Sequence, residues 1–337
     1  MRILVTGAAG FIGSHTVEAL LKAGAGDVAA VDDLSSGRRA NLDPRARFYQ
    51  ADIRDKSAIA VLFEREKPEV LIHLAAQMDV RRSVAEPTLD CEINLIGLLV
   101  LLEAGRRHGL RRVIFASSGG AIYGHQLAFP CDEDHPCRPV SPYGVAKLAS
   151  EAYLYFYRAQ YGIEYAALRY ANVYGPRQDP HGEAGVVAIF CERLLTGADA
   201  VIFGGGEQTR DYVFVKDVAG ANVAALERAA TGAFNIGTGV ETSVNQLYRM
   251  LAEIGGIERA PLRGPARPGE QRRSSISFER ATSALGWRPL VALRDGLAQT
   301  FKYYQSISAN GPAGGAPATP PGSGSHNRSG GRHRSNR

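Results

Sequence analysis

The stretch between Ser117 and Lys147 carries the residues best suited to acid–base chemistry in this chain of 337 residues. Tyr143 and Lys147 are four residues apart, so a helix that begins at Ser141 would project both side chains from one face. A lysine ammonium beside a phenol favours the phenolate and lowers the phenol pKa from its reference value of about 10 toward neutrality. Ser118 could then pass a proton between the phenol and a substrate hydroxyl. The alternative is an ordinary exposed Tyr/Lys pair on an amphipathic helix.

The N-terminal residues favour the catalytic interpretation, because they predict a nucleotide-binding turn. The apolar run 3–5 fits a strand buried on both faces of a parallel sheet, and Gly7, Gly10 and Gly13 follow it before a helix begins. Glycines at these positions allow a tight turn, close approach of backbone N–H groups to a pyrophosphate, and close packing of the helix on the strand. A glycine-rich turn that binds no ligand is the alternative.

A second predicted strand, 28–31, ends at Asp32, about 20 residues beyond the last of these glycines. A carboxylate there can accept hydrogen bonds from the adenosine ribose hydroxyls and would repel the 2′-phosphate of NADP. The spacing therefore favours NAD, although the nearby Arg38 and Arg39 weaken this preference.

Strand and helix patterns then alternate along the chain, with a long helix expected over 87–108. Apolar runs predict further strands over 47–50, 70–74, 113–116 and 163–168. This order predicts an α/β fold with a Rossmann-type doubly wound parallel sheet, in which ligands bind at the carboxyl edge. Ser117 and Ser118 follow one of these strands and should lie at that edge. His73, inside an apolar run, is interpreted as a core histidine.

The charge distribution gives no indication of a nucleic-acid partner. The formal net charge is +5, and residues 309–337 contain four arginines and no acidic residue, so +5 − 4 leaves +1 for the remainder. The remainder shows no basic stripe of the kind that binds nucleic acid. Residues 309–337 are rich in Gly, Pro, Ser and Arg, and are therefore expected to form a disordered tail.

The cysteines and the apolar runs predict a soluble, cytoplasmic protein without a metal site. The four cysteines form no CxxC pair and have no cluster of histidines nearby; they are Cys91, Cys131, Cys137 and Cys191. They are expected to be free thiols in a reducing compartment. The N-terminal apolar run is broken too early for a signal peptide, and the longest apolar run, 93–102, is too short to cross a bilayer.

Eight motifs together resemble the extended short-chain dehydrogenase/reductase family. They are TGAAGFIG, VDDLSSG, HLAAQ, SSGGAIYG, SPYGVAK, LRYANVYGPRQ, QTRDYVFV and RPGE. Their order and spacing are most similar to those of the bacterial and archaeal UDP-glucose 4-epimerases. The resemblance covers roughly residues 1–304.

The resemblance implies which residues contact the cofactor and the substrate. The catalytic residues it implies are Ser118, Tyr143 and Lys147. The NAD contacts it implies are Gly7, Gly10, Phe11, Ile12, Gly13, Asp32, Ser35, Ser36, Gly37, Asp52, Ile53, Leu74, Ala75, Ala76, Gln77, Asn94, Ser117, Tyr143, Lys147 and Tyr170. The UDP-sugar contacts it implies are Ser118, Tyr143, Asn172, Gly185, Val186, Val187, Ile202, Phe203, Gln208, Arg210, Tyr212, Arg267, Glu270 and Ser274.

The resemblance also implies a division into domains and a homodimer. Residues 1–170 would form the NAD-binding domain, to which some later segments return, and 171–308 would form a smaller α/β domain that binds the nucleotide sugar. Helices around 90–108 and 141–161 would pair across a twofold axis. Tyr153, Phe156 and Tyr157 could contribute to that interface or belong to the core.

The reaction implied is inversion at C4 of a UDP-hexose through a transient 4-keto sugar, with NAD recycled in each turnover. Dehydratases that act at C5 and C6 need acids after the serine, whereas this chain has Gly119 and Gly120. Asp179 would repel the carboxylate of UDP-glucuronate, so a neutral hexose is favoured, although a UDP-glucuronate 4-epimerase stays open. The small Ser274 predicts additional activity on UDP-GlcNAc and UDP-GalNAc. A 4-keto-sugar reductase and a non-catalytic NAD(P) sensor are the remaining alternatives.

Overall fold

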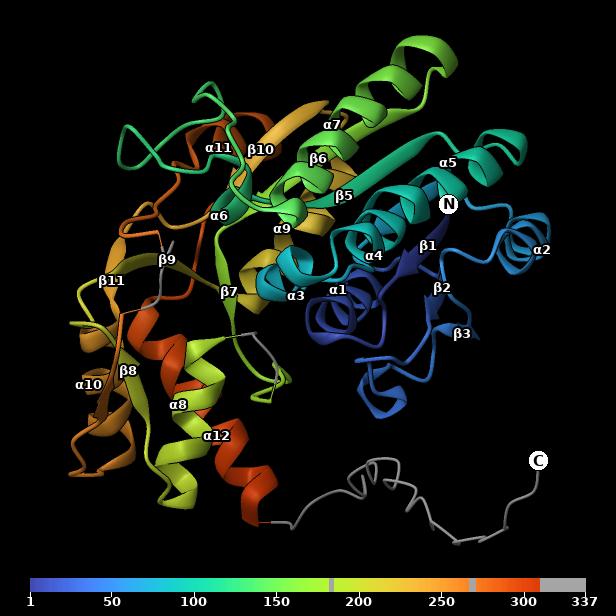
Figure 1. Ribbon diagram of the computed structural model, residues 1–337. Coiled ribbons are helices and arrows are strands. Elements are labelled where there is room, and N and C mark those ends of the chain that lie inside the picture. Colours follow the sequence, from blue (N-terminus) through green and yellow to red (C-terminus); the bar gives the residue numbers. More distant parts are fainter. Residues whose placement is uncertain (182–184, 267–270, 310–337) are drawn as a thin grey trace, which may run out of the picture.

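A parallel sheet forms the centre of the protein in the computed structural model, which describes residues 1–181, 185–266 and 271–309 (Figure 1). Arg267, Glu270 and the tail 310–337 lie outside the described residues. The sheet has seven strands in the order β10-β6-β5-β4-β1-β2-β3. These strands are β1 (Arg2–Thr6), β2 (Asp27–Asp32), β3 (Arg47–Gln50), β4 (Val70–His73), β5 (Arg112–Ser118), β6 (Glu164–Tyr170) and β10 (Gly232–Ile236). The doubly wound α/β fold predicted from the sequence is confirmed.

Helices cover both faces of the sheet because the strand residues alternate between two apolar cores. Ile3 and Val5 of β1 face one core, and Leu4, between them, faces the other. The first core is covered by α1 (Phe11–Lys22), α9 (Val215–Glu227) and α11 (Glu279–Leu285). The second core is covered by α2 (Lys56–Glu66), α5 (Gly97–Arg107) and α7 (Pro142–Tyr161).

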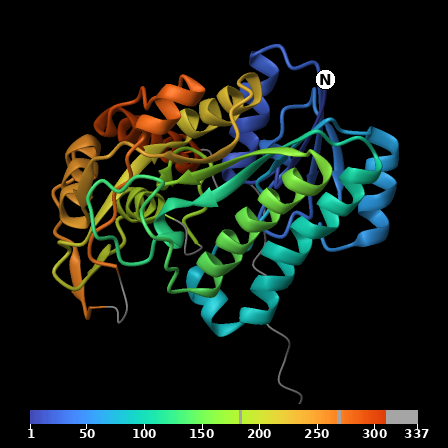
Figure 2. The ribbon, with the colours of Figure 1, turned by 90° about the horizontal axis from the view of Figure 1, so that it is seen from above.

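The helix expected over 87–108 consists of three consecutive segments. They are α4 (Pro87–Cys91), a π-helical turn η2 (Glu92–Ile96) and α5, and the short α3 (Val80–Ala85) precedes them. A π-turn adds a residue to the helical repeat and so changes which side chains face inward. Here it contains Asn94, which is buried. These segments and α7 lie side by side on one face of the molecule (Figure 2).

The later part of the chain forms a second, smaller lobe with its own core. A sheet of order β11-β9-β7 and a β12-β8 pair are surrounded by three helices. The strands are β7 (Asn172–Tyr174), β8 (Val201–Phe203), β9 (Thr209–Phe214), β11 (Glu241–Ser243) and β12 (Leu262–Gly264), and the helices are α8 (Val186–Thr196), α10 (Val244–Gly255) and α12 (Leu293–Ala309). Phe190, Phe214 and Leu247 are among its fully buried side chains.

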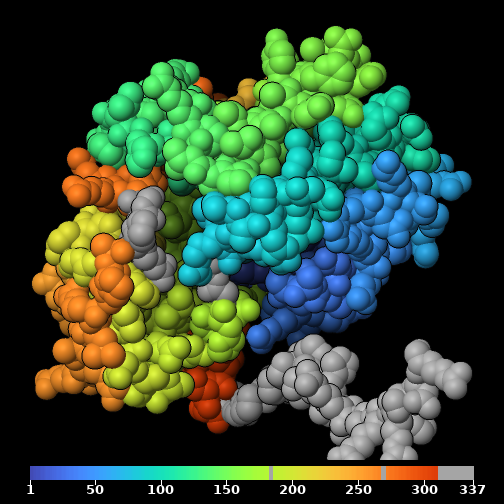
Figure 3. Space-filling model, in the orientation of Figure 1, coloured from blue at the N-terminus to red at the C-terminus, as the bar shows by residue number. Residues whose placement is uncertain are grey.

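The two lobes are interleaved in sequence, because later segments complete the first one. β10 pairs in parallel with β6, and α9 packs against α1. In the space-filling view the N-terminal and C-terminal colours occupy opposite sides of the molecule, with residues near 120–160 above them (Figure 3). Among the described residues, no helix is both long enough and apolar enough to cross a membrane.

Candidate active site

The glycine-rich turn after β1 has a backbone shape that side chains would prevent. Gly7 has a φ of +63°, and a Cβ atom there would lie 2.6 Å from the backbone nitrogen of Ala75. A Cβ atom on Gly13 would collide with the carbonyl oxygen of Gly7. These two glycines therefore let the turn close on the end of β4 and let α1 pack tightly against the turn.

The start of α1 and the end of β2 fit a dinucleotide. Gly10 precedes the first turn of α1, and no side chain caps the free N–H groups there. Asp32 is almost fully buried at the end of β2; its Oδ2 accepts from Ala9 N at 2.9 Å and its Oδ1 from Leu34 N at 2.8 Å. Burial raises the pKa of the Asp32 carboxyl, and these hydrogen bonds oppose that shift. A carboxylate has about four acceptor sites, so the three backbone donors Ala9, Gly10 and Leu34 leave one for a ribose hydroxyl.

The segment after β4 is fixed by a buried polar cluster rather than left free for a ligand. The side chain of Asn94 bonds both backbone groups of Gln77. Its Oδ1 accepts from the Gln77 backbone N–H at 3.0 Å, and its Nδ2 donates to the Gln77 carbonyl oxygen at 2.9 Å. The Oδ1 atom of Asp90 accepts from Asn94 Nδ2 at 2.8 Å and from Gln77 Nε2 at 3.0 Å. The side-chain groups of Asn94 and Gln77, both predicted NAD contacts, are therefore used within the protein.

Ser118, Tyr143 and Lys147, together called the catalytic corner, lie at the carboxyl edge of the sheet. Ser141 caps α7, accepting from Gly144 N at 3.2 Å, so the helix begins where the sequence predicts. Lys147 is buried and donates from Nζ to the carbonyl oxygen of Ala116 at 2.9 Å. Tyr143 is half-buried, and a side-chain hydrogen bond joins it to Ser118.

The electrostatics of this corner differ from the prediction. Burial raises the pKa of Tyr143 to about 12, which the hydrogen bond from Ser118 only partly offsets. Burial also lowers the pKa of Lys147 to about 8, against the opposing charges of Asp90 and Glu151. The expected lowering of the phenol pKa is therefore wrong for the protein alone, because loss of hydration is the largest effect on Tyr143 and raises its pKa.

Ser117 and Ser118 point to different surroundings, because successive strand residues face opposite sides. Ser117 is buried, and its hydroxyl donates to Glu151 Oε1 at 2.5 Å, so this hydroxyl is used within the protein. Ser118 is the serine that reaches Tyr143. Ser117 therefore keeps only its backbone for the predicted NAD contact.

The other predicted cofactor contacts lie around the turn or in the core. Phe11, Ile12, Leu74, Ala75 and Ala76 are half-buried near the glycines, and Ser35 and Ser36 are exposed beyond β2. A Cβ atom at Gly37 would lie 2.6 Å from Asp32 Oδ1. Asp52 is paired with Arg54 at 2.6 Å, whereas Ile53 is buried in the core and Tyr170 donates to Asn222 Oδ1 at 2.9 Å.

The predicted sugar-nucleotide contacts separate into open and buried positions. Asn172 is exposed, and a Cβ atom at Gly120 would lie in ordinary van der Waals contact with Asn172 Oδ1 at 3.9 Å and Ser118 Oγ at 4.0 Å. Arg210 is half-buried and donates from Nη1 to Gln271 O at 2.8 Å. The half-buried positions are Gly185, Val186, Phe203 and Gln208, and the buried ones are Val187, Ile202, Tyr212 and Ser274. Val187 and Ile202 belong to the core of the second lobe, so their side chains are not free for a base or sugar.

Three buried charged residues around the corner were not identified from the sequence. They are Asp90, Glu151 and Arg169. Glu151 follows Lys147 by four residues, a spacing that places it on the same face of the helix. That spacing was a usable signal. Arg169 lies within the motif LRYANVYGPRQ but was given no role, and Asp90 lies in none of the eight motifs.

The sheet, the glycine turn and the serine, tyrosine and lysine at one edge define a Rossmann-type protein that binds NAD. The model of the NAD dependent epimerase/dehydratase family matches residues 3–237, and this chain belongs to that family. A UDP-glucose 4-epimerase of Mycolicibacterium smegmatis is 50% identical over 314 residues, which are 91% of this chain and 100% of the relative.

Two solved structures agree with this assignment. A UDP-glucose 4-epimerase of Thermotoga maritima with UDP-glucose has a TM-score of 0.89 and 50% identity, covering 91% of this chain and 100% of the other. A UDP-glucose 4-epimerase of Thermus thermophilus in complex with NAD has a TM-score of 0.86 and 44% identity, covering 90% of this chain and 99% of the other.

Proposed function

We propose that this protein is an NAD-dependent epimerase that inverts C4 of a UDP-hexose, with UDP-glucose and UDP-galactose as its substrate pair. The observation that carries the proposal is the corner formed by Ser118, Tyr143 and Lys147 beside two glycines. Such a corner can move a proton at a sugar hydroxyl, while the glycines supply no acid for eliminating water. The relatives named UDP-glucose 4-epimerase support the choice of sugar nucleotide.

The cofactor would be held by the glycine turn, the N-terminus of α1 and Asp32. When bound, NAD would supply a hydride acceptor and donor for C4, and the positive charge of its oxidised form would favour the phenolate. Fixed backbone N–H groups and a carboxylate are the partners that a pyrophosphate and a ribose require.

Tyr143 removes the O4 proton, directly or through Ser118, and returns it when the 4-keto sugar is reduced. The proton balance over one turnover is therefore zero. Lys147 stabilises the phenolate by its charge, and its bond to Ala116 O fixes the position of its ammonium. We place Asn172, Arg210, Arg267 and Glu270 on the UDP moiety, where guanidinium groups suit diphosphate oxygens; the last two lie outside the described residues.

The decisive experiment is incubation of the purified protein with a panel of UDP-sugars without added NAD(P)H, with products identified by NMR. Interconversion of UDP-glucose and UDP-galactose over many turnovers is expected. A reductase would stop after at most one turnover, and a sensor would make no product. Turnover confined to UDP-glucuronate would contradict the proposed sugar.

We extend the proposal to N-acetylated UDP-sugars, because Ser274, which is buried here, is a small residue at the position that leaves room for an acetamido group in similar enzymes. Steady-state rates on UDP-GlcNAc and UDP-glucose should then lie within a few orders of magnitude of each other. Absence of turnover on UDP-GlcNAc would restrict the enzyme to the simple hexoses.

We also propose a homodimer through α4, α5 and α7. Val145, Tyr153 and Phe156 expose large apolar or aromatic surface on α7, whereas Tyr157 is buried and donates to Glu103 Oε1 at 2.7 Å. Light scattering should give twice the chain mass, and Phe156→Glu should reduce it to that of one chain. A wild-type mass of one chain would refute the dimer.

We expect the enzyme to act in the cytoplasm, since its four cysteines are unpaired and Cys91 is exposed. Fractionation of cells that express the native chain tests this. Recovery outside the cytoplasmic fraction would contradict it.

A further inference from the structure

The two residues before Ser118 are both tied to α7. Lys147 Nζ donates to Ala116 O at 2.9 Å, and the hydroxyl of Ser117 donates to Glu151 Oε1 at 2.5 Å. Lys147 and Glu151 are one helical turn apart, and Tyr143 lies one turn earlier on the same face. The end of β5 is therefore held against the helix that carries Tyr143.

Glu151 is itself held rigidly by a buried arginine from the neighbouring strand. Arg169 Nη2 lies 2.7 Å from Glu151 Oε2, and Arg169 Nε donates to Glu151 Oε1 at 3.1 Å. The two side chains are only 7% and 10% exposed, so neither is free to exchange this partner for water. A bidentate pair of this kind fixes orientation as well as distance.

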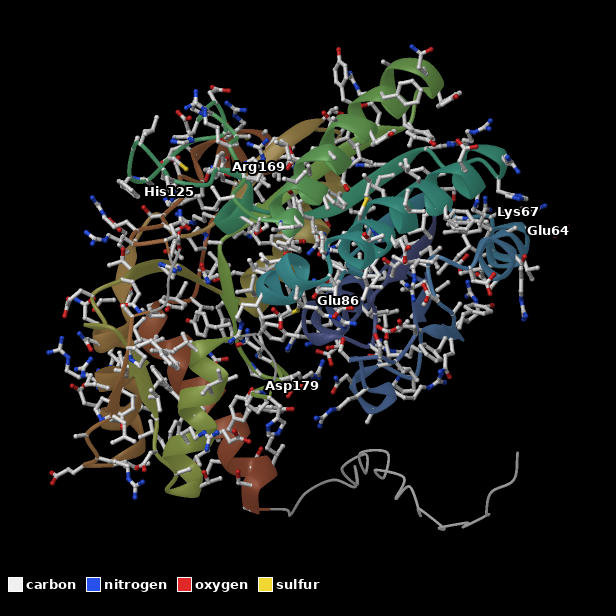
Figure 4. The ribbon with its side chains drawn as sticks, in the orientation of Figure 1. Glu64, Lys67, Glu86, His125, Arg169 and Asp179 are labelled. Atoms are coloured by element: carbon white, nitrogen blue, oxygen red, sulfur yellow. The ribbon has the colours of Figure 1, made fainter. Side chains whose placement is uncertain are left out.

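Arg169 is anchored at its other end. Its Nη1 donates to the Tyr123 hydroxyl at 2.9 Å and to Glu133 O at 3.2 Å. Tyr123 in turn donates to Asn235 Oδ1 at 2.7 Å, which connects the network to β10. Arg169 lies in the upper part of the molecule, near α6 (Gly119–Ile122) and β6 (Figure 4). The network therefore links the end of β5 to three separate elements.

We propose that Glu151, held by Arg169, is a positioning residue for the C4 epimerisation: through Ser117 it fixes where Ser118 lies relative to Tyr143. This inference rests on the proposed function. The contact is neither to substrate nor to cofactor, so its effect falls on alignment. Misplacing a reacting group by about 1 Å costs on the order of 100-fold in rate.

The alignment has an electrostatic consequence. The groups that act on Tyr143 are Ser118, whose hydrogen bond lowers the phenol pKa, and Asp90, whose charge raises it. Lys147 is acted on by Asp90 from α4 and Glu151 from α7, and it faces the neutral His73 of β4. Loss of the Ser118 contact alone would therefore raise the pKa of Tyr143.

The test is Ser117→Ala, which removes the link and keeps the Glu151–Arg169 pair. We expect kcat to fall about 10- to 100-fold with KM unchanged. The acid limb of the pH profile of kcat/KM should move to higher pH. Ser117→Thr restores the hydroxyl and should restore the rate. A purely structural role would lower the yield of folded protein without moving the pH profile.

Ser150→Ala is the matched control. Ser150 is a buried serine of α7, the helix that carries Glu151. Its hydroxyl donates to Ala146 O at 2.8 Å and to Asn94 O at 3.4 Å, and neither partner belongs to β5. This variant should keep both kcat and the pH profile. Should Ser117→Ala not fold, Ser117→Cys offers a side chain of similar size with a weak donor.

The outcomes separate this inference from the proposed function. Inactive wild-type protein refutes the proposed function, whereas active wild-type with an equally active Ser117→Ala refutes only the positioning role. A crystal structure of Ser117→Ala decides the inference without any activity. Displacement of Ser118 from Tyr143 supports it, and unchanged positions of both side chains overturn it.

Discussion

The dinucleotide-binding turn and the catalytic corner lie at the same edge of one sheet but are built in different ways. The turn, which comprises Gly7, Gly10, Gly13 and the start of α1, is shaped by the absence of side chains. The corner, which comprises Ser118, Tyr143 and Lys147, depends on buried polar side chains and on the charges packed around them.

The comparison shows that the two regions should tolerate substitution differently. Adding one carbon at the turn forces backbone atoms apart, so both the fold and cofactor binding respond. Removing one oxygen at the corner leaves the packing nearly unchanged and affects the chemistry. The predictions that follow test this contrast, beginning with the largest effect.

Tyr143→Phe should abolish most activity while preserving the fold. The phenol is the proposed acid and base at O4, and such groups contribute about 10²- to 10⁴-fold in rate. We expect kcat for UDP-galactose to fall about 1,000-fold, with the melting temperature unchanged. Full activity in this variant would end the proposed mechanism.

Gly13→Ala should damage the turn itself. Its Cβ atom would meet the carbonyl oxygen of Gly7 and the Cα atom of Ala8, and overpacking of this kind costs about 1–3 kcal/mol. Denaturant unfolding should show that loss, together with weaker NAD binding. Gly26→Ala is the control, because a Cβ atom there has no atom within 4 Å, and its unfolding curve should match the wild type. Equal stability of both variants would break the contrast.

A smaller effect should appear on acidification. His15 of α1 is buried, its Nε2 lies 3.0 Å from Pro176 O, and burial lowers its pKa to about 4. As the pH falls, the histidine of the unfolded chain is protonated near pH 6.5, before that of the folded protein. The free energy of unfolding is therefore highest above about pH 6.5 and decreases as the pH falls toward 4, by at most about 1.4 kcal/mol per pH unit. The pH dependence of the unfolding free energy should be shallower in His15→Gln. An identical slope would exclude this assignment.

His73 should add to the same acid sensitivity, since burial lowers its pKa to about 3. Its Nδ1 lies 2.7 Å from Thr6 Oγ1. Because Thr6 Oγ1 already accepts from Leu74 N and Ala75 N, the threonine hydroxyl donates its proton to Nδ1. The sequence-based interpretation of a core histidine is confirmed. His73 also connects the glycine turn to the catalytic corner. Its ring stacks on the ring of Phe115, and the Lys147 ammonium lies over that same Phe115 ring.

The sequence by itself determined the parts that depend on spacing along one segment. Alternating apolar runs gave the doubly wound sheet, glycine spacing gave the turn, and the four-residue interval between Tyr143 and Lys147 gave the shared helix face. These features are local, because backbone sterics and helical periodicity act within a few residues.

Only the tertiary structure decided which groups are buried and what partners they find. In the folded protein Ser117 bonds Glu151 and Ser118 bonds Tyr143. The side-chain amide of Asn94 is hydrogen-bonded to the backbone of Gln77. The tertiary structure also raised the pKa of Tyr143 where the sequence had predicted a decrease. Desolvation depends on every atom packed around a group, and those atoms come from strands and helices far apart in the chain.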